Sequence, residues 1–127
     1  MKIEIALASN FKTRHDNLLG NIIESDHGHV AVLTGGQFSP TKHSITEFIV
    51  SEEHRGSGHG TALIREVIQR YKADIGAQVS SMPSLVVMYK LGFRPALKMT
   101  ASLEETKSLF KEEWGSLLLV YKPARDF

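Results

Sequence analysis

The sequence contains no cysteine, and this absence excludes several kinds of chemistry. A chain of 127 residues without a thiol has no disulfide framework, no thiolate metal ligand and no cysteine nucleophile. Long apolar runs are also missing. None approaches the ~20 residues that cross a bilayer, and the first residues lack the apolar core of a signal peptide. We therefore expect a cytoplasmic protein that does not span a membrane.

The chain also lacks a large excess of positive or of negative charge. The 15 basic and 14 acidic residues leave a formal net charge of +1, so gross charge predicts neither nucleic acid nor a membrane surface as a partner. Hydrophobic residues make up 42% of the chain and charged residues 23%, which are the proportions of ordinary soluble proteins. Because no linker or repeat interrupts the chain, we expect one domain over residues 1–127.

The most informative stretch is a glycine-rich turn between a predicted strand and a predicted helix. Residues 45–50 are rich in β-branched and aromatic side chains, whereas residues 61–72 repeat apolar side chains at helical spacing. The turn between them reads Arg55-Gly56-Ser57-Gly58-His59-Gly60-Thr61. Three alternate glycines let consecutive N–H groups converge on an anion at the positive end of the helix. The turn is therefore predicted to bind phosphate, and a purely structural turn is the alternative.

The spacing of this turn argues against two common nucleotide-binding loops. A Walker loop needs a lysine directly after its last glycine, and no lysine lies between Arg55 and Lys72. The dinucleotide fingerprint Gly-x-Gly-x-x-Gly would need a glycine where the chain has Thr61. Neither loop fits the sequence.

The remaining pattern, Arg55-x-x-Gly58-x-Gly60, resembles the GNAT superfamily of acetyl-CoA-dependent N-acetyltransferases. A second segment at residues 84–93, Ser-Leu-Val-Val-Met-Tyr-Lys-Leu-Gly-Phe, is similar to a later short helix of that family. The likeness covers residues 45–95. It implies an α/β (α+β) fold with a central mixed, mainly antiparallel sheet of six to seven strands, flanked by three to four helices. It also implies acetyl-CoA as the cosubstrate.

Hydrophobic periodicity predicts the other elements. Strands are expected at residues 2–8, 29–34, 44–50, 77–80, 95–100 and 116–122, with a short strand or loop at 37–42. Helices are expected at residues 13–24, 61–72, 83–92 and 102–115, the last with Phe110 and Trp114 in the core. The resembled family often walls its acceptor site with two helices between its first strands. A single helix here would leave the acceptor groove open.

The resemblance assigns the cofactor site to the glycine turn and to the strand before it. The pyrophosphate of CoA would lie against Arg55, Gly56, Ser57, Gly58, His59, Gly60 and Thr61. In the family the pantetheine arm pairs with main chain between two splayed strands. The resemblance implies that the main chain of Ile49 and Val50 pairs with this arm. One of their N–H groups would then face the thioester carbonyl, and their side chains would lie in the core. Ser84, near the start of the later helix, completes this set.

The predicted general base is Glu47. An alkylammonium group with a pKa of ~10 must lose a proton before its nitrogen attacks the thioester. Strand alternation is expected to put Glu47 on the same face as Ile45 and Ile49, where partial burial would make the carboxylate a better base. A solvent-facing or ion-paired glutamate is the alternative interpretation. The weaker candidates are His43, Glu52 and Glu53.

The departing CoA thiolate needs a proton donor, and at the position of this donor the sequence differs from the family pattern. The family's tyrosine stands five residues before the phenylalanine of Gly-Phe, a position that is Met88 here, with Tyr89 one step later. One residue turns a helix by about 100°, so Tyr89 is either a shifted acid or a packing residue. A hydroxyl of Ser81 or Ser84, or a water molecule, is the alternative donor.

The predicted function is direct transfer of the acetyl group of acetyl-CoA to a primary amine of a small molecule, peptide or protein. Two alternatives stay open: a non-catalytic module that binds CoA or a protein partner, and an interaction protein with an empty loop. A homodimer in which the second subunit completes the acceptor site also stays open. No metal is expected, because His27-x-His29 lacks a third ligand at a recognisable spacing.

Overall fold

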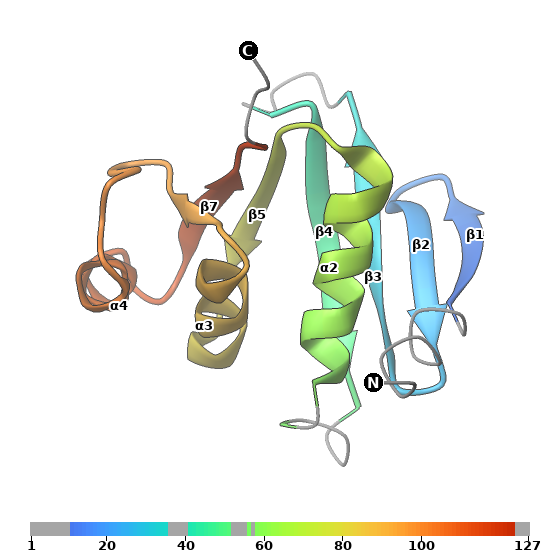
Figure 1. The fold of residues 1–127 in the computed structure, drawn as a ribbon, viewed down its shortest axis with the longest axis horizontal. Helices are drawn as coiled ribbons and strands as arrows, with labels where there is room; N and C mark the ends of the chain where they lie inside the picture. The colour runs from blue at the N-terminus through green and yellow to red at the C-terminus, as the bar shows by residue number, and fades with distance from the viewer. Residues whose placement is uncertain (1–10, 36–40, 52–55, 57, 124–127) are drawn as a thin grey trace.

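The centre of the molecule is a seven-stranded sheet with the order β1-β2-β3-β4-β5-β7-β6 (Figure 1). The structure is a computed structural model that describes residues 11–35, 41–51, 56 and 58–123. Strands β4 and β5 run parallel and the other described neighbours run antiparallel. The expected mixed, mainly antiparallel sheet is confirmed. Its strands are β1 (Lys12–Asp16), β2 (Gly20–Ser25), β3 (Gly28–Thr34), β4 (His43–Val50), β5 (Ile75–Val79), β6 (Arg94–Pro95) and β7 (Leu117–Tyr121).

Three helices pack with this sheet in the described part of the chain. They are α2 (His59–Tyr71), α3 (Met82–Lys90) and α4 (Leu103–Glu112). Figure 1 shows α2 lying across β3 and β4, with α3 beside it and α4 at the far end of the sheet. Leu63, Ile64 and Val67 in the apolar stripe of α2 are fully buried, and they join one core cluster with side chains of the sheet and of the other two helices. No helix in this part of the chain is long and apolar enough to span a membrane.

The helix predicted at residues 13–24 is wrong, because this segment forms the β1–β2 hairpin. Gly20 opens β2 with a φ of +94°, and a Cβ atom there would lie 2.2 Å from the carbonyl oxygen of Val32. This close approach between neighbouring strands requires glycine. Pairing with β3 therefore overrides the helical spacing of the apolar residues, a long-range effect that local propensity does not contain.

Two further expectations about the C-terminal half are also wrong. The strand predicted at residues 95–100 is reduced to β6, which pairs with β7 through Arg94 and Pro95. Trp114 is 96% exposed and has a φ of +59°, so it lies outside the core, whereas Phe110 is buried as expected. The strand predicted at residues 2–8 lies outside the described residues. The other predicted helices and the strands at 29–34, 44–50, 77–80 and 116–122 are confirmed within a few residues.

His43 at the start of β4 is buried, with 6% of its surface exposed. Its Nδ1 lies 2.8 Å from the hydroxyl of Thr34, and its ring centroid lies 4.6 Å from that of Tyr71. Burial lowers the pKa of His43 below its usual value, and the neighbouring Lys42 lowers it further. The folded protein therefore favours the neutral imidazole. His43 is buried and is not among the residues that line the cavity described below, which favours a structural role.

We predict that the free energy of unfolding decreases as the pH falls below about 6.5, the ordinary pKa of histidine. The pKa of His43 is lower in the folded state than in the unfolded state, so at this pH the unfolded chain binds a proton that the folded chain does not. His43→Gln does not titrate at this position, and its stability should depend less on pH. Urea unfolding of both proteins between pH 7.5 and 5 measures the difference. Identical pH dependence in the two would contradict the assignment.

Candidate active site

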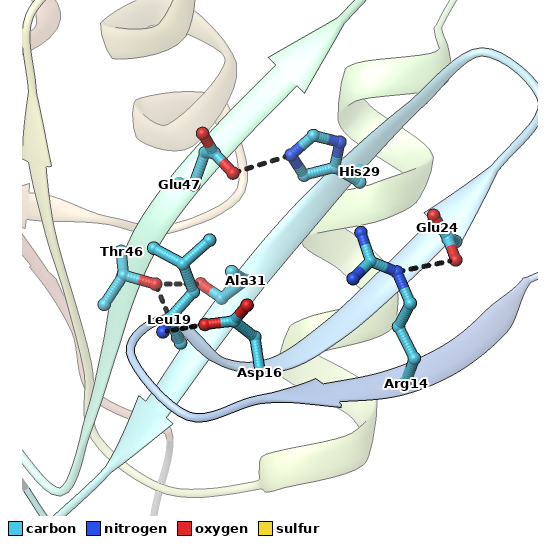
Figure 2. A network of polar contacts seen from close by, with 8 residues as sticks. All are labelled: Arg14, Asp16, Leu19, Glu24, His29, Ala31, Thr46 and Glu47. Carbon is cyan, nitrogen blue, oxygen red and sulfur yellow. Dashed lines mark hydrogen bonds and ion pairs between the residues drawn. The ribbon is translucent and has the colours of Figure 1, made fainter.

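Strand β4 carries an extra residue at Thr46. The pairing of β4 with β3 shifts by one residue between Ala31 and Val32, which leaves Thr46 without a partner in the ladder. The Thr46 hydroxyl donates a hydrogen bond instead to the carbonyl oxygen of Leu19 in the β1–β2 turn, at 2.7 Å (Figure 2). A β-bulge of this kind bends the strand that carries it and is frequent beside active sites.

The β1–β2 turn that receives this hydrogen bond is itself held in one conformation. One oxygen of the Asp16 carboxylate accepts hydrogen bonds from the N–H groups of Leu18 and Leu19, at 2.8 and 2.9 Å. These bonds favour the ionised carboxylate and lower the pKa of Asp16 below its usual value. The turn therefore gives the bulge a fixed anchor.

Strands β4 and β5 part where the bulge lies. Their parallel ladder joins three residue pairs and ends with Ile45 opposite Ala77, although β4 continues to Val50 and β5 to Val79. The parting opens a cavity of about 180 Å³. It is smaller than the roughly 300–1,000 Å³ of pockets that enclose whole ligands, so it suits a narrow chain. The lining consists of residues 45–48 of β4, residues 77–80 of β5 and the turn after it, and Ser84 and Met88 of α3.

The helix that follows β4 begins without a side-chain cap. Its N-cap, Gly58, has a φ of +86°, and Gly56 has a φ of +84°, conformations that favour glycine. The side chains of Ser81 and Ser102 cap α3 and α4, whereas no side-chain cap occurs on α2 in the described part of the chain. The first-turn N–H groups of α2 thus form the kind of helix end that accepts an anion.

The glycine turn and the cavity are neighbours. A Cβ atom on Gly60 would lie 3.1 Å from the ring of Phe48, which lines the cavity, and 3.4 Å from a methyl group of Val50. Glycine at this position therefore lets α2 approach β4 closely. A ligand that spanned the turn and the cavity would run along this contact.

The bulge puts Glu47 and Ile45, which were predicted to share a face of the sheet, on opposite faces. Glu47 shares a face with Ile49, as expected, but Ile45 pairs with Val32 and packs against the core on the α2 side. The extra residue at Thr46 breaks the simple alternation from Ile45 to Glu47, so that part of the prediction is wrong. Glu47 itself lies in the cavity lining, with 36% of its side chain exposed.

The other residues predicted on β4 and on the glycine turn are only partly described. The side chain of Ile49 is 46% exposed and is not in the core, whereas Val50 packs against the core as expected. His59 lies in the first turn of α2, half-buried, with its ring centroid 4.1 Å from that of His27. Thr61 is also half-buried in this turn. Arg55, Ser57, Glu52 and Glu53 lie outside the described residues.

Tyr89 is not among the residues that line the cavity. Its hydroxyl donates to the carbonyl oxygen of Ala101 at 2.9 Å, and the Arg94 guanidinium lies 3.7 Å from the centre of its ring. Met88, one residue earlier, occupies the cavity lining. Because the two positions differ by about 100° around α3, the hydroxyl does not reach the cavity unless the helix shifts. This geometry favours the packing role for Tyr89.

The two serines at the start of α3 have different surroundings. Ser81 caps α3 by accepting a hydrogen bond from the N–H of Ser84 at 3.3 Å, and its hydroxyl donates to that of Ser84 at 2.9 Å. Ser84 lies in the cavity lining, whereas Ser81, the N-cap of α3, does not. Of the predicted hydroxyl donors, Ser84 is therefore the better placed.

Sequence reasoning considered His29 only as a possible metal ligand and gave Thr46 no role. The imidazole Nε2 of His29 lies 2.8 Å from a carboxylate oxygen of Glu47, and these two side chains point toward each other from neighbouring strands in Figure 2. The contact depends on the register of β3 against β4, including the bulge. No local signal in the sequence reveals that register.

The chain belongs to the acetyltransferase (GNAT) family, whose model matches residues 6–93 and thus more than half of the chain. The resemblance in the glycine turn and the later helix is confirmed by this match. Among curated proteins, no sequence matches the chain significantly.

Several solved structures have the same fold at low sequence identity. N-acetylglutamate synthase from Neisseria gonorrhoeae, complexed with coenzyme A and N-acetyl-glutamate, is 17% identical with a TM-score of 0.55; the match covers 98% of this chain and 33% of that one. The Bacillus subtilis N-acetyltransferase YlbP in complex with coenzyme A is 15% identical with a TM-score of 0.54, over 81% of this chain and 66% of that one. The present chain therefore spans about a third of the length of the first protein and about two thirds of the length of the second.

A third similar structure is nearer in length. A GNAT family acetyltransferase from Elizabethkingia anophelis with acetyl-CoA bound is 15% identical with a TM-score of 0.54, over 95% of this chain and 82% of that one. At these identities the comparisons establish the shared fold, while the family assignment rests on the family model.

We predict that Tyr89→Phe destabilises the protein by about 1 kcal/mol, because the hydrogen bond to Ala101 is lost, and leaves turnover unchanged. Tyr121→Phe is the matched control, since the ring of Tyr121 packs against Phe93 and its hydroxyl makes no hydrogen bond to another described residue. Thermal unfolding and an acetyl-transfer assay measure the two effects. A large loss of turnover in Tyr89→Phe, without a loss of folding, would restore Tyr89 as the acid.

Proposed function

We propose that the protein is an N-acetyltransferase that passes the acetyl group of acetyl-CoA directly to a primary amine. The observation that carries this proposal is the cavity that opens where β4 parts from β5, next to the uncapped glycine end of α2. Family membership supports the reaction class, and the coenzyme A and acetyl-CoA complexes of similar structures support the ligand.

The described residues fit this ligand at two points. Gly56 and Gly58, both with positive φ, lead into first-turn N–H groups that suit the diphosphate. The narrow cavity suits the arm that carries the thioester, and the main chain of β4 beyond Ile45 has left its ladder with β5. An N–H group of Ile49 or Val50 is proposed to face the thioester carbonyl and to stabilise the charge that develops on its oxygen.

Glu47 is proposed as the general base. Its carboxylate takes one proton from the acceptor ammonium group, and the neutral nitrogen then attacks the acetyl carbon. A C–N bond forms and the C–S bond breaks. The nitrogen releases its second proton to water during this step, and the departing thiolate takes up a proton. Ser84, alone of the predicted hydroxyl donors, lines the cavity and is proposed to donate it directly or through a water molecule.

A non-catalytic module that binds CoA is the second candidate. Met88 favours it, because this side chain without an acidic proton lines the cavity at the position where the resembled family has a tyrosine. The two candidates differ in one measurable respect. The module binds acetyl-CoA without releasing thiol in the presence of amines.

We predict that Gly58→Ala weakens the binding of acetyl-CoA by about tenfold. A Cβ atom on Gly58 would meet nothing within 4 Å, so the loss comes from its φ of +86°, which costs other residues about 1–2 kcal/mol. Gly35→Ala is the matched control, because Gly35 has a φ of +74°, equally open space and a place outside the proposed site. Isothermal calorimetry should show weaker binding for Gly58→Ala alone. Equal affinities would contradict a phosphate site at this turn.

We predict that the wild-type protein releases free thiol from acetyl-CoA with at least one amine of a panel of polyamines, amino acids, aminoglycosides and peptides. The mass of the product should rise by one acetyl group. Glu47→Gln should lower kcat by about a hundredfold or more near neutral pH, because its amide cannot take the ammonium proton. The defect should shrink as the pH rises toward the pKa of the amine, about 10, where the nucleophile is already neutral.

Glu24→Gln is the control for this substitution, since Glu24 lies on the same face of the sheet but pairs with Arg14 on the outermost strand. It should keep the wild-type kcat. Binding of acetyl-CoA to the wild type without transfer to any amine would favour the non-catalytic module. An active Glu47→Gln variant would retain the transferase and remove Glu47 as its base.

A further inference from the structure

We infer that His29 is a positioning residue that orients the Glu47 carboxylate toward the acceptor amine; this inference rests on the proposed function. His29 lies on β3 and Glu47 on β4, and Nε2 of the imidazole lies 2.8 Å from Oε2 of the carboxylate. Their side chains are 26% and 36% exposed, so solvent screens the contact only in part. Glu47 lines the cavity. His29 is not among the lining residues and is joined to the cavity by its contact with Glu47.

The bulge creates this contact. In an unbroken ladder continuing from Val32 opposite Ile45, Glu47 would pair with Val30 and face the α2 side of the sheet. The extra residue at Thr46 moves Glu47 opposite Ala31, onto the face where His29 stands. His29 itself pairs with Ile49, so its ring meets Glu47 along the diagonal between the strands. The same irregularity thus opens the cavity and brings the imidazole to the carboxylate.

The direction of the hydrogen bond follows from the chemistry of the two groups. An ionised carboxylate only accepts hydrogen bonds, so the proton must be on Nε2, whether the imidazole is neutral or charged. The bond uses Oε2 and leaves Oε1 of Glu47 for the acceptor ammonium group. A carboxylate held by one oxygen loses less rotational freedom when the substrate binds, which favours a productive geometry.

The charges around His29 favour Glu47 as its partner. On the β2 side, the described group that faces the imidazole is Glu24, its partner in the ladder. The carboxylate of Glu24 already accepts a hydrogen bond from Nε of Arg14 on β1, at 3.1 Å. On the β4 side, the facing group is Glu47 (Figure 2). Two carboxylate contacts therefore lie side by side on this face of the sheet, Arg14 with Glu24 and His29 with Glu47, and of these four residues only Glu47 lines the cavity.

The test compares variants of His29 that differ in whether the side chain at this position can donate a hydrogen bond to Glu47. His29→Leu and His29→Asn remove this donor, since leucine has no N–H and the asparagine amide is too short, whereas His29→Gln keeps an amide donor of suitable length. We expect kcat to fall about tenfold or more in the first two and to stay within about threefold of wild type in His29→Gln. The KM for acetyl-CoA should stay unchanged in all three.

Two controls separate positioning from a general loss of structure. Arg14→Leu breaks the outer ion pair of the same face and should keep the wild-type kcat. In a double-mutant cycle, His29→Leu should add little to the defect of Glu47→Gln, because the oriented group is already gone. Thermal unfolding and acetyl-CoA calorimetry confirm that each variant is folded. If His29→Leu does not fold, His29→Asn decides the outcome.

Two results would overturn this inference alone: wild-type kcat in His29→Leu and His29→Asn, or defects of His29→Leu and Glu47→Gln that multiply in the double variant. Either result would leave the proposed transferase standing. An absence of thiol release by the wild-type protein across the amine panel is a different outcome. It would overturn the proposed function, and the role of His29 with it.

Discussion

The candidate site depends on the parting of β4 from β5 beyond Ile45. Parallel strands that stayed paired would leave no space between them, and their main-chain groups would be used up in the ladder. One extra residue, Thr46, bends β4 away at this point, and the cavity begins there. The cavity and the main chain that borders it lie at this irregularity in an otherwise regular sheet.

Polar contacts hold the bulge on the side of β4 where the Thr46 hydroxyl lies. The Thr46 hydroxyl bonds to the carbonyl oxygen of Leu19, and two amides of that turn bond in turn to Asp16. The opposite side of β4 is anchored by apolar contacts, with Ile45 and Phe48 packed against the core beneath α2. The strand is thus fixed on both faces at the level where the two central strands separate, which gives a site built on rigid elements.

The success of the sequence-based predictions follows the range of the interactions involved. The glycine turn and α2 were predictable because strand propensity, three alternate glycines and a helical apolar stripe lie within one short segment. The hairpin of β1 and β2 was not, since its apolar residues also fit a helix and only pairing with β3 decides between the two. Trp114 fits a helical apolar face in the sequence, but α4 ends at Glu112, before that face reaches it.

The sequence by itself determined the family and the place of the glycine turn, because these depend on residue types at fixed local spacing, and the family resemblance in turn implied the mainly antiparallel sheet. Only the tertiary structure decided which side chains meet at the cavity. The contact of His29 with Glu47, the exposure of Ile49 and the placement of Met88 rather than Tyr89 depend on strand register and helix rotation. A shift of one residue moves a strand side chain to the opposite face or turns a helical one by about 100°. Such shifts are set by contacts between distant segments.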